Sequence, residues 1–491
     1  MSLYLAQYQF WTPKILQNEA TQALTASEVK DFFLNCQSDF AFVFHKDGEL
    51  VFGRDIFGRR SLIICGNTNL KEGEIEIRHG FNGQDVAKLE NGQTRAEEVP
   101  VGTIFHLKNV PEPKITDTSF IFSYNSNTWE NITTEIYTYY PVNPPYSDAY
   151  NLLNANVTHL DSTSYIKPSC DFSDGDGDRD FESVARKLID EMKKATVDIF
   201  QPDLVIPDHH LSGPVNMPEQ VSVSFSGGVD SLFVTVIAAT VFPEVKQFNL
   251  INTLFGDTEE DQDKAHDRKK GREAFEWLCE YFGPKFSMIE VNVPREDIEK
   301  HRSTIRTVMY PKDTVLDESL ASVVWFGSRG KGKQVFYKDH QGLEFKPSPF
   351  AFCGSGSDEL LGGYARHRTY YEKGGWESLH EGLEAEICRI GERNFGRDDR
   401  ITMSNGVALI APFMHDSFVK WITAVPLPYR VDFREPRGIG EKKLLRVAMR
   451  LLGLPPHLTD TPKKAMQFGS GYVKQHSKGK NGADKLGVNM D

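Results

Sequence analysis

The stretch Ser-Gly-Gly-Val-Asp-Ser at residues 226–231 decides how the rest of this chain is interpreted. An alternating, β-branched run at 221–225 precedes it and predicts a strand, and a long apolar run at 232–240 follows it and predicts a buried helix. A strand, a turn with two glycines and a helix N-terminus direct free backbone N–H groups and the positive end of the helix dipole towards one point. Since glycine lets a phosphate approach the backbone, the pattern predicts an anion site, with Asp230 as a carboxylate for the magnesium ion that accompanies nucleotide phosphates. A tight strand–helix turn without a ligand is the simpler alternative.

A second glycine-containing turn lies further along the chain. Residues 350–364 read Phe-Ala-Phe-Cys-Gly-Ser-Gly-Ser-Asp-Glu-Leu-Leu-Gly-Gly-Tyr, which predicts a short strand followed by a helix with Ser357 as its N-cap. In an open parallel sheet, ligands bind beyond the carboxyl ends of neighbouring strands. Two such turns would hold one nucleotide between them, with Asp230 and Asp358 sharing its magnesium. Taken alone, the second segment would be a capped helix with exposed acids.

These two motifs resemble the synthetase half of asparagine synthetases. The first is similar to the pyrophosphate loop of enzymes that split ATP into AMP and pyrophosphate, and it is no Walker loop, because no Gly-Lys-Ser/Thr follows it. The resemblance is strong over 221–474. The segments most similar to a divergent branch of the family, the asparagine synthetase domain-containing proteins, are 313–319, 396–400, 436–442 and 465–470.

The resemblance implies an α/β fold with a doubly wound parallel sheet of the adenine nucleotide α-hydrolase type. The order of segments agrees, because predicted strands alternate with predicted helices, a rhythm typical of a parallel sheet. The expected strands are 221–225, 248–255, 287–293 and 350–352, and the expected helices are 181–200, 232–240, 261–281, 295–309 and 316–326.

The resemblance also implies a reaction and its residues. A substrate carboxylate would attack the α-phosphate of ATP in the presence of Mg²⁺, and ammonia would displace AMP from the acyl-adenylate. Lys463 and Lys464 are both candidates for the family's catalytic lysine, and the spacing to Phe468 leaves the choice open. The ATP-binding residues would be Phe225, Ser226, Gly227, Gly228, Asp230, Ser231, Phe255, Cys353, Gly354 and Asp358, of which Asp230 and Asp358 would hold the metal.

The first 140 residues are β-rich and resemble the late part of a class II glutamine amidotransferase domain. A hairpin is expected around Asp47-Gly48, and Arg54 and Asp55 are expected to stabilise this hairpin rather than to act in chemistry. The family's glutaminase uses a cysteine directly after the initiator methionine, whereas Ser2 stands here, and the segments that hold glutamine are absent. We therefore expect a shortened domain without a glutaminase nucleophile, although an N-terminal serine nucleophile is the alternative.

Composition narrows the remaining choices. Residues 141–180 are polar and proline-containing and are expected to be a linker, 181–474 the ATP-binding domain and 475–491 a disordered tail. A formal net charge of −13 argues against a nucleic-acid partner. The six cysteines form no CxxC pair, and no signal peptide or apolar run of roughly eighteen residues is present. We expect a cytoplasmic protein, without a membrane partner, that acts on small molecules: ATP, an aspartate-like carboxylate and ammonia.

Three departures from the family keep two functions open. Ser355 stands where the family has the glutamate expected at the ammonia step, and Ala408 and Ile410 stand where it has a Glu and an Arg. Apolar residues in place of an ion pair need not destabilise the fold. Retention of Asp230 and Asp358 favours a working ligase that uses free ammonia. The substitutions at Ser2 and Ser355 favour a pseudoenzyme that binds ATP and serves as an interaction module.

Overall fold

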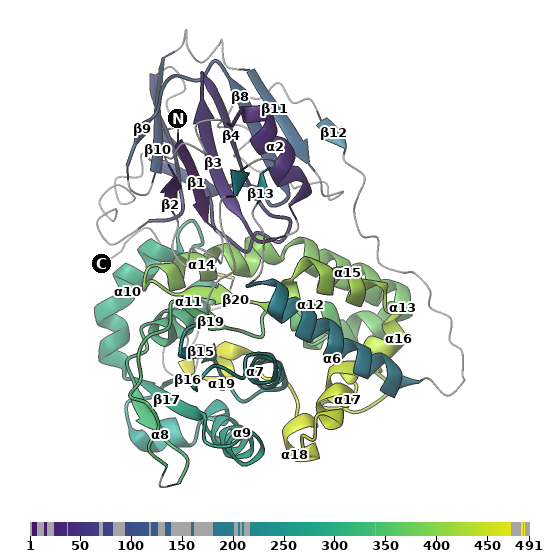
Figure 1. Cartoon of the computed structure of the whole chain (residues 1–491). Coiled ribbons are helices and arrows are strands. Elements are labelled where there is room, and N and C mark those ends of the chain that lie inside the picture. The colour runs from purple at the N-terminus through teal and green to yellow at the C-terminus, as the bar shows by residue number, and fades with distance from the viewer. Residues whose placement is uncertain are drawn as a thin grey trace.

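The computed structural model describes residues 2–6, 14–16, 24–36, 38–67, 72–81, 94–116, 119–125, 133–138, 159–161, 180–200, 205–206, 209–210, 217–338, 340–472, 483–484 and 486. The described residues form a mixed α/β structure with four sheets, which confirms the expected class. An N-terminal pair of sheets stands on a larger C-terminal unit of a sheet and many helices (Figure 1).

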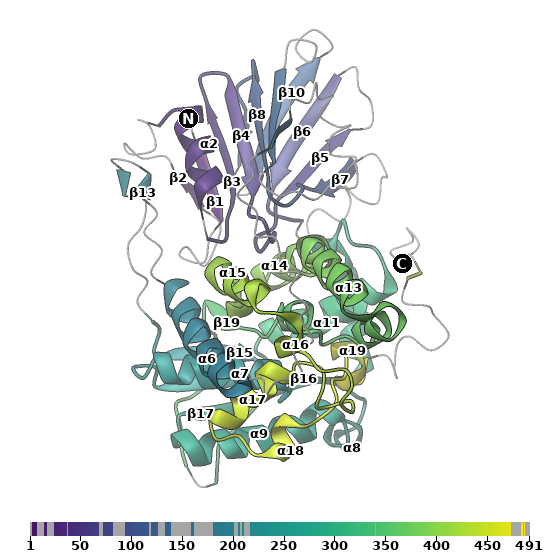
Figure 2. The same cartoon turned by 90° about the vertical axis from the view of Figure 1, so that its right-hand side faces the viewer.

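The N-terminal unit is a sandwich of two sheets with α2 (Ala26–Asn35) on its outer face (Figure 2). Phe52 and Phe105 of the larger sheet stack at 4.9 Å and face Ile77 and Phe120 of the smaller one. The larger sheet has the order β12 (His159–Asp161), β11 (Thr133–Thr138), β8 (Thr103–Lys108), β4 (Glu49–Arg54), β3 (Ala41–Lys46), β1 (Ser2–Ala6), β2 (Lys14–Leu16). The smaller has the order β7 (Thr94–Glu98), β5 (Ile63–Asn67), β6 (Glu72–Arg78), β10 (Ser119–Asn125), β9 (Lys114–Ile115).

The hairpin between β3 and β4 is confirmed. Asp47 and Gly48 have φ values of 50° and 76°, the left-handed pair that a two-residue hairpin turn requires. Asp55 accepts hydrogen bonds from the N–H groups of Phe40 and Phe57, and Arg54 donates to the Gly58 carbonyl at 2.6 Å. Asp55 thus ties the two ends of the hairpin together, as expected, whereas Arg54 holds the turn that follows β4.

The C-terminal unit is built on a six-stranded sheet. Five strands are parallel and β18 is antiparallel. The strand order reverses between β15 and β19, the kind of position at which open parallel sheets bind ligands. The order is β18 (Lys333–Val335), β17 (Phe286–Val293), β16 (Gln247–Phe255), β15 (Gln220–Ser224), β19 (Phe350–Phe352), β20 (Ala408–Ile410).

Helices pack on both faces of this sheet. Phe248 and Leu250 of β16 face α7 (Val229–Val241) and α9 (His266–Phe282), whereas Ile251 faces α10 (Arg295–Met309) and α11 (Val315–Ser328). The remaining elements are α6 (Phe181–Asp198), α8 (Glu259–Asp263), α12 (Ser357–Leu361), α13 (Ala365–Cys388), η2 (Gly391–Phe395), α14 (Gly396–Met403), η3 (Pro412–Met414), α15 (Asp416–Ala424), α16 (Leu427–Arg430), α17 (Lys443–Leu451), α18 (Pro456–Thr459), α19 (Met466–Gly469) and the strand pair β13 (Val205–Ile206) and β14 (His209–His210).

The expected elements of this unit are present, with one correction. The helix predicted over 261–281 is two helices, α8 and α9, separated by Lys264 and Ala265. The break left no signal in the sequence, because both residues are good helix formers. Most of the expected linker at 141–180 and of the tail at 475–491 lies outside the described residues. In the tail, Asp484 and Leu486 make backbone hydrogen bonds to Val315 and Asp313. Among the described helices, none has the length and apolar character needed to cross a bilayer.

Candidate active site

Four charged side chains converge beyond the carboxyl ends of β15 and β19, where the two glycine-containing turns meet. Lys442 Nζ lies 2.5 Å from Asp230 Oδ1 and 2.7 Å from Asp358 Oδ1. Lys463 Nζ lies 2.9 Å from Asp230 Oδ2 and 2.5 Å from Asp358 Oδ2. Each carboxylate bridges both ammonium groups, and we call this closed group of two acids and two bases the charge quartet.

The charge quartet is largely shielded from solvent. The side chain of Lys442 has no exposed area, those of Asp230 and Asp358 are 12% and 13% exposed, and that of Lys463 is 29% exposed. Burial by itself would raise the pKa of both carboxyl groups, but the two lysines hold the pKa of each below its ordinary value. Burial would lower the pKa of Lys463, yet the two carboxylates raise it. Asp230, Asp358 and Lys463 are therefore charged at neutral pH.

Two glycines allow the turns to approach this closely. A Cβ on Gly354 would lie 2.6 Å from the Cβ of Asp230, and a Cβ on Gly363 would overlap both Asp358 Oδ1 and Lys442 Cε. Atoms at such separations repel strongly, so no other residue fits either position without moving an aspartate. The conformation of the second motif thus depends on its glycines at 354 and 363.

The N-terminus of α7 is open to an anion. Gly228 caps this 13-residue helix and, having no side chain, gives its first turn no side-chain cap. Ser226 Oγ accepts from the Gly228 N–H at 3.3 Å, and Ser231 Oγ donates to the Gly228 carbonyl at 3.2 Å, which fixes the turn. Gly227 has φ +73° and packs against the backbone of α9. The N–H groups of the first turn and the helix dipole are available to phosphate oxygens.

The residues present fit a magnesium ion that also binds phosphate. Asp358 Oδ1 is buried and pairs with Lys442 Nζ at 2.7 Å, yet it accepts no hydrogen bond of good geometry from any described residue. This oxygen would become a metal ligand once the lysine turns to another anion. Within the described part of the chain, no three His, Cys, Asp or Glu side chains gather as a metal site. A metal here would take its other ligands from phosphate and water, as Mg²⁺ commonly does.

The two candidate lysines differ in position. Lys463 belongs to the charge quartet, whereas Lys464 is exposed and makes no ion pair with any residue that the structure describes. Residues 461–465 form neither a helix nor a strand, and the two neighbouring side chains differ in exposure. The geometry therefore favours Lys463 for chemistry at the phosphates.

Lys442 is a site residue that the sequence analysis missed. It lies at the start of α17 with φ +55°, an uncommon conformation for a residue with a side chain, and this aims its ammonium group into the interior. Its neighbour Lys443 pairs with Glu435 instead. The only indication in the sequence was that Lys442 is the last residue of the 436–442 segment, one of those that resemble the divergent branch of the family. The neighbouring residues do not distinguish Lys442 from Lys443.

The expected cap of α12 is wrong by one residue. Gly356, with φ +94°, is the N-cap, and Ser357 is the first helical residue. The Ser357 hydroxyl accepts a hydrogen bond from Lys442 Nζ at 2.9 Å. Glycine supplies a left-handed cap that serine adopts only with strain, so the serine oxygen is available to the charge quartet.

The remaining predicted nucleotide residues lie along the same sheet edge. Phe225 and Cys353 are buried and follow neighbouring strands, and burial raises the pKa of the Cys353 thiol. Phe255 ends β16, its N–H donates to the Ser470 carbonyl at 2.9 Å, and its ring packs edge-on against Tyr472. Phe255 thus lies beside the segment that follows Lys463, away from the charge quartet itself.

The three departures have different surroundings. Ala408 and Ile410 are buried in β20 and belong to the apolar core, so apolar packing occupies these positions. Ser355 is half-buried between Gly354 and Gly356, in the turn that leads to Asp358. Of the three substituted positions, only that of Ser355 belongs to a segment that carries a member of the charge quartet.

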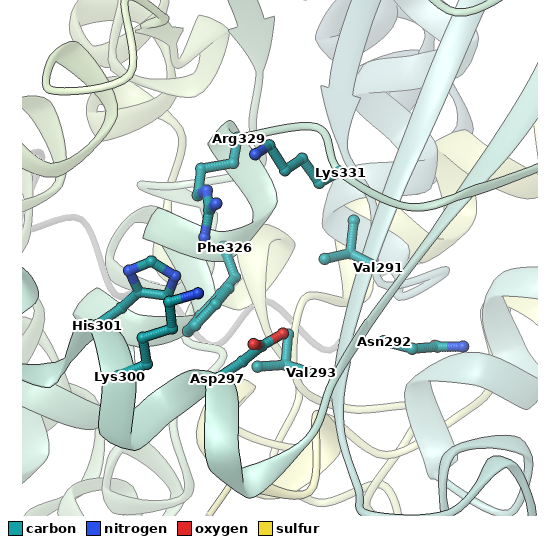
Figure 3. A pocket seen from close by; sticks show the side chains of 9 residues that line it. All are labelled: Val291, Asn292, Val293, Asp297, Lys300, His301, Phe326, Arg329 and Lys331. Carbon is teal, nitrogen blue, oxygen red and sulfur yellow. The ribbon is translucent and has the colours of Figure 1, made fainter.

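A separate cavity of about 140 Å³ lies between β17, α10 and α11 (Figure 3). Lys300, Arg329 and Lys331 are among its lining residues, and Phe326 forms part of its wall. The Phe326 ring packs edge-on against Phe255, with centroids 6.1 Å apart. The cavity holds none of the predicted site residues.

Lys270 is a further cation beside the turn at 226–231. Its side chain donates to Thr461 Oγ1, in the segment that leads to Lys463, and its backbone packs on Gly227. Burial, together with the nearby Arg446 guanidinium, lowers the pKa of Lys270 to about 8, against the opposing effect of nearby acids that include Asp230.

We expect the affinity of the free protein for MgATP to fall as the pH rises from 7.5 to 9. Lys270 loses its charge as the pH passes its pKa of about 8, so its attraction for phosphate is full below that pH and lost above it. The expected fall is about two- to fivefold, the size of a partly exposed ionic contribution. In calorimetric titrations Lys270→Met should lack this step, and Lys269→Met, at an exposed neighbour, should keep it. A step of equal size in Lys270→Met would contradict the assignment.

Comparison with known proteins places these features in a family. The family model for asparagine synthase matches residues 217–373 and 369–486. "Asparagine synthetase domain-containing protein 1" of Homo sapiens is 26% identical over an alignment of 544 residues, which covers 96% of this chain and 83% of that protein. The protein of the same name in Gallus gallus is 34% identical over 300 residues, which covers 52% of this chain and 46% of that protein. "Putative asparagine synthetase [glutamine-hydrolyzing] 1" of Methanocaldococcus jannaschii is 34% identical over 149 residues, 25% of this chain and 27% of that protein.

Proposed function

Because this chain belongs to the asparagine synthase family, we propose that it is an ATP-dependent ligase that activates aspartate, or a similar carboxylate, as an acyl-adenylate and amidates it. The observation that carries the proposal is the charge quartet at the ends of two adjacent parallel strands. It offers two carboxylates to a metal and two ammonium groups to phosphates. We assign the sheet accordingly to the doubly wound, adenine nucleotide α-hydrolase-like type.

The composition of the charge quartet suits an exchange of partners. Without nucleotide, two negative and two positive charges balance, which avoids the large cost of burying an unpaired charge. When ATP binds, Lys442 and Lys463 exchange carboxylate for phosphate oxygens. Asp230 and Asp358 would then hold magnesium, which would supply charge neutralisation on the leaving pyrophosphate. Each of the four protein charges would thus keep a partner of opposite sign in both states.

The reaction needs positioning and charge stabilisation rather than a protein nucleophile. A carboxylate oxygen of the substrate attacks the α-phosphorus of ATP, the bond from that phosphorus to the bridging oxygen breaks, and pyrophosphate leaves with the electron pair. Lys463 stabilises the charge that develops on the phosphate oxygens, since preorganised charge is usually the largest catalytic contribution. The nitrogen of ammonia then attacks the acyl carbon, AMP leaves with the bond's electrons, and one proton passes to solvent.

We propose free ammonia as the nitrogen source. Ser2 begins β1, which pairs with β3 of the sandwich, and it offers a hydroxyl where the family's glutaminase uses a thiolate. Ser355 replaces the glutamate that the family places at the ammonia step, so the second step should be the slower one.

The proposed function is tested by nitrogen donors and by Ser355→Glu. With ATP, Mg²⁺ and aspartate, ¹⁵N-ammonium should label the amide product in mass spectra, whereas amide-¹⁵N-glutamine should not, in both the parent and Ser2→Ala. Ser355→Glu should raise the yield of amide about tenfold or more while leaving pyrophosphate exchange within about twofold, because one correctly placed general base or acid is worth ~10²–10⁴ in rate. Glutamine-derived amide that Ser2→Ala abolishes would overturn the donor assignment, and an unchanged amide yield in Ser355→Glu would overturn the role given to this position.

A further inference from the structure

We propose that the N-terminal sandwich acts on the active site as a positioning element, through Arg59. This would give the sandwich a function other than supplying ammonia: holding the loop that carries Asp358 in the conformation of the charge quartet. Arg59 is then a positioning residue, and the inference rests on the proposed nucleotide site for its consequence in catalysis.

The turn after β4 inserts into the C-terminal unit. Phe57, at its tip, is 2% exposed and belongs to the same apolar core as α7 and β15, although its chain neighbours belong to the sandwich. The Phe57 backbone lies against Gly391 of η2, where a Cβ would be 2.6 Å from the Phe57 carbonyl oxygen. The two units therefore share one core at this point rather than touching through solvated surfaces.

Arg59 links this turn to the segment around η3. Its Nη1 donates to the Met414 carbonyl at 2.8 Å and lies 2.7 Å from Asp416 Oδ2, while its Nε donates to Asp55 Oδ1 at 2.9 Å. The Arg59 side chain is 2% exposed, so these are desolvated, charge-assisted contacts, the kind that costs most to lose. Arg59 thus fixes the position of Met414 relative to the sandwich.

Met414 in turn supports the loop that carries Asp358. Met414 is fully buried, and a Cβ on Gly356 would overlap its Sδ, so its side chain lies directly against the Gly356 backbone. Gly356 is the N-cap of α12, which begins with Ser357 and Asp358. One chain of contacts, from Arg59 through Met414 and Gly356, therefore leads from the sandwich to a member of the charge quartet.

The same interface contains a second ionic contact that does not lead to this loop. Arg60 Nη1 pairs with Asp399 of α14 at 2.8 Å, and Asp399 also accepts from the Ser61 N–H. Arg60 is as deeply buried as Arg59. It is therefore a matched control: an equal perturbation of the interface that leaves Met414 untouched.

The test compares two double variants, each of which removes one positive and one negative charge. Arg59→Gln with Asp416→Asn removes the contact to Met414, and Arg60→Gln with Asp399→Asn is the control. Each leaves one buried carboxylate without its arginine, Asp55 in the first and Asp39 in the control, so the two perturbations match. Hydrogen exchange is measured by mass spectrometry on a peptide covering 354–363, which contains the N–H groups of Leu360 and Gly363 that bond within the loop and α12. We expect exchange about tenfold faster in the first pair and unchanged in the control, the effect of losing one charge-assisted hydrogen bond.

A second measurement connects positioning with function. The dissociation constant for MgATP should rise about tenfold in the first pair and less than about twofold in the control. If the first pair does not fold, Met414→Ala replaces it, with Met414→Leu as the control that keeps the volume. Equal exchange in 354–363 for the test and control pairs would overturn the inference. Failure of the proposed function would show differently, because the parent itself would then not bind MgATP while the exchange difference persisted.

Discussion

Asp230→Asn should abolish the dependence of ATP binding on magnesium. In the parent, Mg²⁺ should tighten ATP binding, because Asp230 and Asp358 would hold the metal beside the phosphates. In the variant the metal loses one of two carboxylates, and the remaining Asp358 is shared by Lys442 and Lys463. Metal-free ATP should still bind, since both ammonium groups remain. The expected loss in affinity for MgATP is at least about 100-fold, as for removal of one partner of a buried charged contact.

The measurement is calorimetric titration of ATP with and without Mg²⁺. Asp263→Asn is the matched control, because Asp263 pairs with Arg272 at an exposed site on α8 and touches no member of the charge quartet. It should leave both affinities unchanged. A variant at Asp230 that keeps the parent's magnesium dependence would show that the metal is bound elsewhere.

Lys463→Met should reduce AMP formation by at least about 100-fold, whereas Lys464→Met should change it by less than about threefold. The loss of one preorganised group that stabilises transition-state charge typically costs ~10²–10³ in rate. Lys463 is paired with both aspartates, and Lys464 is exposed. Methionine keeps most of the aliphatic chain and removes the charge, so the comparison isolates the ammonium group.

AMP release from labelled ATP at saturating substrate gives this comparison directly, and the fold of each variant is checked by its melting temperature. Equal losses in both variants would mean that the paired lysines act together. A large loss in Lys464→Met alone would identify Lys464, which lies outside the charge quartet, as the catalytic cation. That result would contradict the assignment of Lys463.

The parts of the site that were predictable are those that local sequence specifies. The turn at 226–231 and its flanking strand and helix are encoded by glycine, alternation and apolar length within one short stretch. Asp230 and Asp358 could be paired in advance because parallel strands end at the same sheet edge. The hairpin at Asp47-Gly48 was predictable for the same local reason.

The parts that were missed depend on contacts between distant segments. Lys442 reaches the charge quartet because its own backbone is left-handed and because Gly363 has no side chain to block it. The residues next to Lys442 in the sequence predict neither feature. The pairing of Arg59 with Asp416 likewise joins residues of different units. The choice between Lys463 and Lys464 depended on which side chain faces the interior of the protein. A difference of one residue in the spacing to Phe468 does not decide this.

The proposed ligase reaction requires the charge quartet to hold MgATP for cleavage between the α- and β-phosphates. Its decisive test is product analysis after incubation of the intact chain with α-labelled ATP, Mg²⁺ and each amino acid in turn, with Lys463→Met as the inactive control. We expect labelled AMP together with pyrophosphate, most with aspartate or a close relative, and none from Lys463→Met. Labelled ADP as the product, or no AMP with any amino acid while ATP still binds, would contradict it, and the latter result would identify the chain as an ATP-binding pseudoenzyme.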